Sequence, residues 1–150
     1  MKTNLTTQEI EFLNENRTKK QTDLDVSLAT KNEDLAIKLL KLNAPGFAEK
    51  YNILLRCIEN KLNKVAKFIL KSDKKLFFYK NSNNYSILHF AVWFKNFKFV
   101  KFLVKEDLQF SNLNSLNKWN QRPLDLAIFI SDFKTADFLR KHYSVCLPIK

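Results

Sequence analysis

The segment NKWNQRPLDLAIFI, residues 117–130, decides how the rest of this 150-residue chain is interpreted. It starts with a polar turn, passes through Arg122-Pro123 and continues as an apolar stretch. A helix that buries one stripe of side chains should be polar on its opposite side. Here, however, Phe129 and Ile130 directly follow residues that already fill such a stripe, namely Leu124, Leu126, Ala127 and Ile128. Either this helix is buried on all sides or its second face contacts something else.

The same apolar spacing recurs earlier in the chain. Segments 52–71, 86–105 and 122–141 align without gaps, at offsets of 34 and 36 residues, and a weaker first copy covers 23–41. The aligned columns include Leu54, Leu88 and Leu124; the small residues Ser27, Cys57, Ala91 and Ala127; and Ala36, Ala66, Val100 and Ala136. A fixed period in this range is typical of repeat proteins.

Each copy is predicted to form two short helices with a tight bend between them. In the third copy the bend lies near Lys95-Asn96. The predicted buried residues of that copy are Leu88, Ala91 and Val92 in the first helix and Phe99, Val100, Phe102 and Leu103 in the second. One helix pair cannot cover its own apolar face, so neighbouring pairs must stack, and the small columns allow close approach. The Asn-rich and Ser-rich connections 72–84 and 106–120 are predicted to project as loops.

This pattern resembles that of ankyrin-repeat proteins. The family pattern has a polar turn, then Thr-Pro-Leu-His, an apolar residue and Ala-Ala, a glycine-centred bend, and a second helix that ends in Leu-Leu. The stretches NSNNYSILHFA (81–91) and NKWNQRPLDLA (117–127) are similar to it. Pro123-Leu124 stands at the family's Pro-Leu and His89 at its histidine. The similarity covers about residues 20–143 and implies an all-α solenoid of about four units.

The chain departs from the family at its glycines. The bend glycine is replaced by Lys31, Lys61, Lys95 and Ser131, and the turn glycine by Asn84 and Asn120. Asparagine tolerates the left-handed backbone conformation better than most residues, so the exchange in the turns is physically reasonable. Lysine in the bends suggests altered bend geometry or strain. A tetratricopeptide or HEAT solenoid is disfavoured, because those repeats lack the Pro-Leu turn.

The resulting interpretation is a single ankyrin-repeat domain over residues 1–150. Thr6 and Glu9 form a candidate capping box in a polar N-terminal capping helix within residues 1–19. The repeats then occupy about 20–48, 49–80, 81–116 and 117–143, and residues 144–150 form a tail. Fold similarity indicates a binding module only by analogy, because ankyrin repeats share a shape rather than an activity.

No pattern in the sequence indicates catalysis, so the protein is predicted not to be an enzyme and to carry no cofactor. His89 occupies the family's structural position, and a lone histidine needs partners before it can act as a base. Asp125 takes the same column in the fourth unit and is predicted to cap its turn. Two cysteines and two histidines are too few for a convincing zinc site, so no metal is expected. Cys57 and Cys146 are read as free thiols in a reducing compartment.

The aromatic residues answer the question raised by the opening segment. In the family, the two positions after the Ala-Ala pair point into the concave groove; here they are Glu59-Asn60, Trp93-Phe94 and Phe129-Ile130. Trp93, Phe94, Phe129 and Ile130 are predicted to form a partner-binding patch, with Tyr85 and Trp119 contributing from the loops. Two alternatives stay open. The N-terminal helix or the Leu147–Ile149 tail could cover these residues, or a tightly curved array could bury them against each other.

The net charge of +11 is concentrated in the middle of the chain. Residues 51–105 carry 12 of the 26 Lys and Arg residues but only 2 of the 15 acidic residues. Spacings of three and four place the lysines of each helix on one face, predicted to be convex and opposite the aromatic patch. This basic stripe consists of Lys64, Lys67, Lys71, Lys98, Lys101 and Lys105. It could serve solubility alone or attract an acidic surface.

The leading hypothesis is therefore a non-enzymatic protein-interaction module whose partner is another protein with an acidic surface, or a second copy of the chain. The alternative is a nucleic-acid or anionic-membrane binder that uses the lysines of residues 61–105. No apolar run is long enough for a membrane span or a signal peptide, so a cytoplasmic location is expected. The richness in Lys and Asn with one glycine suggests an AT-rich genome, which is compatible with a small effector delivered into a host cell.

Overall fold

A computed structural model of the chain describes residues 7–8, 23–107 and 112–146, with side chains described as far as residue 142. Throughout these ranges the regular structure is helical, which confirms the predicted all-α class. Residues 7–8 and 23–29 are helical. The further helices are α2 (Glu33–Leu42), α3 (Phe47–Glu59), α4 (Asn63–Ser72), α5 (Lys75–Phe78), α6 (Ile87–Trp93), α7 (Phe97–Glu106), α8 (Pro123–Phe129) and α9 (Phe133–Cys146).

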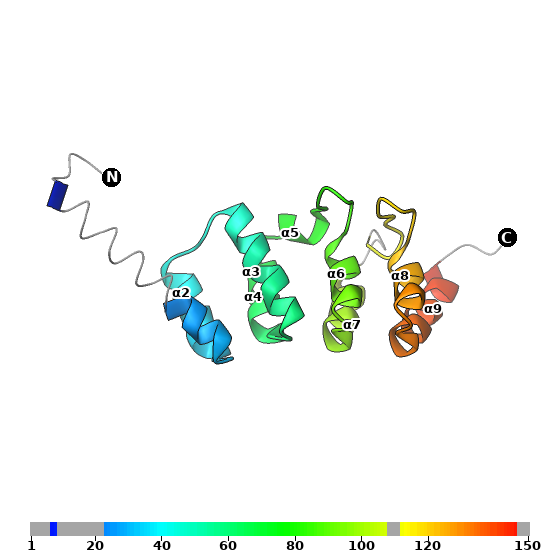
Figure 1. Cartoon of the computed structure of the whole chain (residues 1–150), viewed down its shortest axis with the longest axis horizontal. Coiled ribbons are helices and arrows are strands. Elements are labelled where there is room, and N and C mark those ends of the chain that lie inside the picture. Colours follow the sequence, from blue (N-terminus) through cyan, green and yellow to red (C-terminus); the bar gives the residue numbers. More distant parts are fainter. Residues whose placement is uncertain (1–6, 9–22, 108–111, 147–150) are drawn as a thin grey trace. The chain divides into compact units, whose positions relative to one another are not determined.

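The chain divides into two compact units, Met1–Phe47 and Ala48–Lys150, where the sequence predicts one domain. The division lies next to Pro45-Gly46, close to the predicted boundary between the first and second repeats. The first unit holds residues 23–29 and α2. In the second unit the helix pairs α3–α4, α6–α7 and α8–α9 follow one another, as Figure 1 shows. Apart from residues 7–8, the predicted N-terminal capping helix lies outside the described residues.

All four bends between paired helices have the same backbone structure. The residue at the centre of each bend has a positive φ: 59° at Lys31, 60° at Lys61, 56° at Lys95 and 61° at Ser131. At the third bend the N–H of Lys95 donates to the oxygen of Val92 (2.9 Å), and that of Asn96 to the oxygen of Ala91 (3.0 Å). Equivalent bonds close the other three bends. The lysines therefore adopt the left-handed conformation that glycine favours, so the bends store strain and keep their geometry.

The core follows the predicted columns. The small residues of both columns are buried, as are Leu54, Leu88 and Leu124, which confirms that the alignment groups equivalent positions. Two residues are more exposed than their columns in the alignment predict. Phe102 is only half-buried. Leu35, which shares a column with the fully buried Val65, is 41% exposed in the first unit, whose sequence fits the repeat least well.

The two long connections end in exposed turns, but each also contains a buried segment that the sequence does not predict. The first contains the short helix α5, where Leu76 is fully buried, and the second contains the equally buried Leu113. The carboxylate Oδ2 of Asp107 accepts hydrogen bonds from the backbone N–H groups of Asn112 and Leu113, at 2.9 and 3.0 Å. The Asn112 amide donates to the oxygen of Phe77 at 3.1 Å. Because these segments bury leucines, their backbone groups need partners within the protein.

The second repeat differs from the third and fourth at its start. Helix α3 has 13 residues, whereas α6 and α8 have 7 each. Additional helical residues from Phe47 onward therefore replace the polar turn that precedes α6 and α8. The turns that could present a binding surface are thus found in the last two repeats.

Candidate interaction site

The turn before α6 is closed by the side chain of Asn81. Its Oδ1 atom accepts hydrogen bonds from the backbone N–H groups of Asn83 and Tyr85, at 3.0 and 2.9 Å. The backbone N–H of Asn84 donates to the oxygen of Asn81 at 2.8 Å, and Asn84 has a φ of 59°. An asparagine side chain that bonds to nearby backbone groups fixes a tight turn without glycine.

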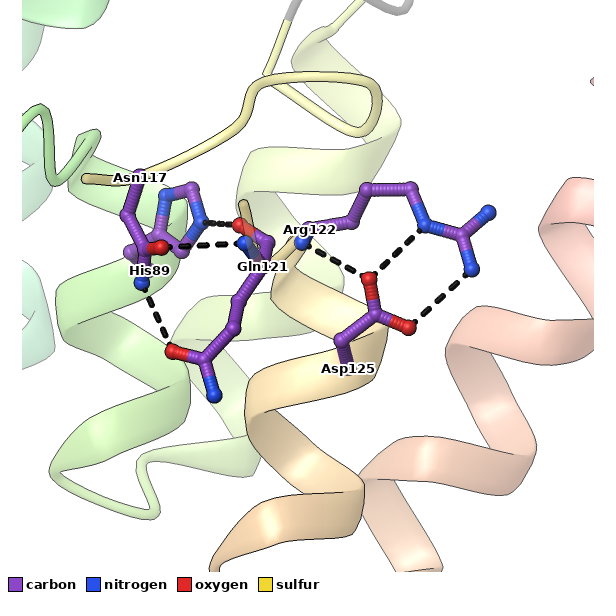
Figure 2. A network of polar contacts seen from close by, with 5 residues as sticks. All are labelled: His89, Asn117, Gln121, Arg122 and Asp125. Atoms are coloured by element: carbon purple, nitrogen blue, oxygen red, sulfur yellow. Dashed lines mark hydrogen bonds and ion pairs between the residues drawn. The ribbon is translucent and has the colours of Figure 1, made fainter. Parts of the chain in front are cut away.

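The turn before α8 repeats this arrangement with Asn117 as the closing residue. Its Oδ1 atom accepts from the backbone N–H groups of Trp119 and Gln121, at 2.9 and 3.0 Å. The amide of Asn117 also donates to the Gln121 side chain at 2.9 Å, as Figure 2 shows. Asn120 has a φ of 60°. Asparagine thus occupies the left-handed position in both turns, as the sequence predicts.

His89 joins the two turns. Its Nδ1 atom accepts hydrogen bonds from the backbone N–H and the hydroxyl of Ser86, at 3.2 and 2.9 Å. Its Nε2 atom lies 2.8 Å from the backbone oxygen of Gln121 (Figure 2) and must donate, because a carbonyl only accepts. A second link of 2.8 Å runs from the N–H of Lys118 to the oxygen of Asn83. These are the turn-to-turn contacts expected of a structural histidine.

Asp125 caps the turn of the fourth repeat, as predicted. Its Oδ2 atom accepts from the backbone N–H and the Nε of Arg122, at 2.9 and 3.0 Å, and its Oδ1 from Nη2 at 3.1 Å (Figure 2). These hydrogen bonds, from the Arg122 side chain above all, lower the pKa of Asp125. Burial lowers the pKa of His89 and outweighs its hydrogen bond to Gln121, which acts in the opposite direction. The lowered pKa values favour the neutral imidazole of His89 and the ionised carboxylate of Asp125, which are the forms that accept these hydrogen bonds.

Three of the predicted site residues, Tyr85, Phe94 and Trp119, belong to a continuous set of ring contacts, here called the aromatic row. Trp119 meets Tyr85 edge-on (6.3 Å between ring centroids), Tyr85 contacts Phe90 (5.1 Å), and Phe90 stacks on Phe94 (6.0 Å). The sequence did not single out Phe90. Its spacing of four from Phe94 on one helix is the signal that could have done so.

Trp93 and Phe129 occupy equivalent positions, as the last residues of α6 and α8. Trp93 is 47% exposed and Phe129 is 71% exposed. Phe94 and Ile130, the residues that follow, are the helix C-caps and are half-buried. Much of the predicted patch is therefore exposed in the described structure. The N-terminal helix and the residue 147–149 tail, proposed as possible covers, lie outside the described residues.

Two exposed apolar residues of the last helix pair were not predicted. Ile128 is 45% exposed, although Val92 in the same column is fully buried. Phe133 is 66% exposed, whereas Phe97 in the same column packs edge-on against Phe138 of the next pair, with 5.6 Å between ring centroids. Burial at these columns therefore depends on a following helix pair, which a column alignment does not reveal.

The predicted basic stripe lies on α4 and α7, and its lysines are exposed except for Lys67, which is half-buried. The sequence predicts that this stripe and the aromatic residues lie on opposite faces, but two phenylalanine rings lie beside its lysines. The Nζ atom of Lys67 lies 4.9 Å from the ring centroid of Phe102, and that of Lys101 lies 5.1 Å from the centroid of Phe97. Aromatic rings are thus present beside the basic stripe as well as in the aromatic row, because Phe97 and Phe102 are only half-buried.

Within the described ranges, no group of three His, Cys, Asp or Glu residues could hold a metal ion. None of the described helices combines the length and apolar character that a bilayer span requires. Cys57 is fully buried. The sequence matches no protein-family model and no curated protein.

Proposed function

We propose that this chain is a non-enzymatic protein-interaction module of ankyrin type, which binds a protein partner through the aromatic row together with Trp93, Phe129 and Ile130. The proposal of ankyrin type is supported by the shared bends at four positions, the paired turns before α6 and α8, and the histidine that links those turns. It is further supported by the burial of the small-residue columns.

The observation that carries the proposed binding role is the exposure of Trp93 and Phe129 at equivalent positions of neighbouring helices. Large aromatic side chains are enriched among the residues that dominate binding energy at protein interfaces. The aromatic row extends the apolar surface from the tip of a turn, at Trp119, to the C-cap of α6, at Phe94. An extended surface of this kind fits a partner better than an isolated exposed ring.

The expected partner is a protein with an apolar segment flanked by acidic residues. Exposed lysines adjoin the aromatic residues in the sequence, with Lys95 next to Phe94 and Lys118 next to Trp119. Charges at the rim of an interface mainly accelerate association and select partners of opposite charge. The aromatic rings at the centre would therefore supply most of the affinity, and the lysines at the edge would select the partner.

Chemical cross-linking of the purified chain in cell extract, followed by titration of the recovered partner, tests this function. The Trp93→Ala/Phe129→Ala variant should lose about 2 kcal/mol or more of binding free energy, as expected when two interface aromatics are removed. Phe133→Ala is the matched control, because Phe133 is comparably exposed on a different helix. The proposal would be contradicted if the double variant bound the partner as tightly as the wild type, or if Phe133→Ala lost as much binding free energy as the double variant.

The same variants distinguish a foreign partner from a second copy of the chain. Sedimentation velocity at several concentrations should show a monomer if the surface awaits another protein. A dimer that dissociates in the Trp93→Ala/Phe129→Ala variant, but not in Phe133→Ala, would instead identify self-association as the role of this surface.

A further inference from the structure

A separate surface on the second helices of the repeats is strongly basic. Helix α4 contains no acidic residue, and the only one in α7 is its last residue, Glu106. In α9, Lys134 continues the row, after which Asp137 pairs with Arg140 and Lys141 at 3.6 and 3.5 Å. We call this surface the basic face; its residues are Lys64, Lys67, Lys71, Lys98, Lys101, Lys105 and Lys134.

Contacts between successive helices hold the basic face together. The ammonium group of Lys67 on α4 lies over the ring of Phe102 on α7, and that of Lys134 on α9 lies over the ring of Phe97 on α7, 4.5 Å from its centroid. The amides of Asn63 and Asn96 also bond to each other across α4 and α7, at 2.7 and 3.3 Å. A cation over an aromatic ring is held in place by the quadrupole of the ring. Several lysines are therefore positioned before any partner arrives.

The lysines extend in two directions. Within a helix, the spacings of three and four place them along its axis, and across α4, α7 and α9 they follow neighbouring helices that lie about 8–10 Å apart. The result is a broad patch of ammonium groups rather than a single track. Lysine offers a point charge without the fork geometry of arginine, so it favours a diffuse anionic surface over a specific planar ligand.

From these observations, we propose that the basic face docks the protein on the surface of an anionic lipid bilayer. Clusters of four to eight lysines are attracted to anionic headgroups, with each lysine adding about fivefold to the affinity. Negative headgroups form a flat, laterally continuous surface, which matches the two-dimensional distribution of these lysines. This binding is peripheral and goes beyond the proposed protein interaction, because it uses α4, α7 and α9 rather than the turns and the ends of α6 and α8.

Single-stranded nucleic acid fits this surface less well. Proteins that bind single strands stack bases on open aromatic rings. On the basic face, the rings of Phe97 and Phe102 are approached by the ammonium groups of Lys101, Lys134 and Lys67. The four arginines, Arg17, Arg56, Arg122 and Arg140, all lie outside α4 and α7, so these helices lack the usual reader of bases and phosphates.

Vesicle co-sedimentation of the full chain tests the proposal. Phosphatidylcholine vesicles with about a third phosphatidylserine should bind the protein at low salt, and pure phosphatidylcholine vesicles should not. The Lys71→Gln/Lys98→Gln/Lys105→Gln variant removes three exposed charges and should bind roughly 100-fold more weakly. The control, Lys38→Gln/Lys80→Gln/Lys118→Gln, removes the same charge from exposed positions outside α4, α7 and α9 and should retain most of the affinity. Circular dichroism verifies that both variants are folded.

Three results would overturn the proposal: equal binding to neutral vesicles, equal losses in the two triple variants, and tighter binding to a 20-nucleotide single strand or a duplex than to anionic vesicles. The third result would assign the basic face to nucleic acid. None of these outcomes depends on a protein partner, so the proposed function can fail while this inference holds, and the reverse also applies.

Discussion

The Nε2 atom of His89 lies 2.8 Å from the main-chain oxygen of Gln121, 32 residues further along the chain. Because the other ring nitrogen accepts from Ser86, one imidazole closes the turn at the start of its own helix and secures the next turn. The two turns carry Tyr85 and Trp119, whose rings meet edge-on. A buried hydrogen-bond network thus sets the geometry of the proposed binding surface.

Replacing His89 with alanine should reduce the free energy of unfolding by about 2–4 kcal/mol. The change removes bonds on both sides of a fully buried ring and leaves the Ser86 N–H and the Gln121 oxygen without this partner. Urea denaturation provides the measurement. His142→Ala is the control, since that half-buried ring contacts Phe138 of its own helix. Similar losses in both variants would show that the link between the turns contributes little.

Stability should decrease as the pH falls below about 6.5. Burial lowers the pKa of His89 in the folded protein beneath its usual value of 6.5, so between the two pKa values the unfolded chain binds the additional proton. The stabilisation is fully present above 6.5 and is lost as the pH falls toward the folded pKa, at no more than about 1.4 kcal/mol per pH unit.

Unfolding free energies of the wild type and of His89→Gln, measured between pH 7.5 and 5, check this prediction. The wild type should lose stability over this interval more steeply than the variant. Lys80 and Asp125 influence the same ring in opposite directions, the lysine lowering and the aspartate raising its pKa. The pKa values of Asp73 and Asp125 are lowered from 3.8, so their stabilisation is lost only at more acidic pH. Parallel pH profiles would rule out His89 as the group responsible.

Lys95→Gly should raise the free energy of unfolding of the second compact unit, Ala48–Lys150, by about 0.5–1 kcal/mol. The left-handed conformation costs a non-glycine residue about 1–2 kcal/mol, and the greater freedom of glycine in the unfolded chain offsets part of the gain. Lys101→Gly, in the interior of α7, should instead destabilise the unit by about 1 kcal/mol. Thermal and chemical unfolding of the two variants gives the sign directly. A destabilised Lys95→Gly variant would mean that the bend does not strain the lysine.

Asn96→Asp should cost about 2–3 kcal/mol, although it preserves the shape of the side chain. The Oδ1 atom of Asn96 caps α7 at the N–H of Phe99, which a carboxylate would also do. The Nδ2 atom, however, donates to the oxygen of Ile58 at 2.9 Å and to Oδ1 of Asn63 at 2.7 Å, and an aspartate would place a buried negative oxygen against these acceptors.

The reverse exchange at the equivalent position, Asp132→Asn, is the control for Asn96→Asp. Asp132 is half-buried and bonds to the N–H and hydroxyl of Thr135 within its own helix pair. An amide can supply one oxygen to these donors, so a change within about 0.5 kcal/mol is expected for Asp132→Asn. Equal effects of the two exchanges in denaturant titrations would remove the argument that Asn96 links successive repeats.

Part of the candidate site could be anticipated from the sequence, and part could not. The exposure of Trp93 and Phe129 followed from their place in a repeated column, where the local helix pair decides which way a residue faces. The exposure of Ile128 could not be anticipated in this way, because its column is buried at Val92, where a further helix pair follows. The burial of Leu76 and Leu113 in the long connections could not be anticipated either, because the Asn and Ser residues around them are typical of exposed loops.

The sequence by itself determined the paired helices, the bends between them and, within the described ranges, the six residues with positive φ. These features depend on hydrogen bonds that span five residues or fewer, so the chain specifies them locally. Only the tertiary structure decided that His89 reaches Gln121, that Trp119 meets Tyr85, and that Lys67 lies over Phe102. Each of these contacts joins residues more than 30 positions apart, and its geometry is set by how closely one helix pair packs on the next, which no single repeat encodes.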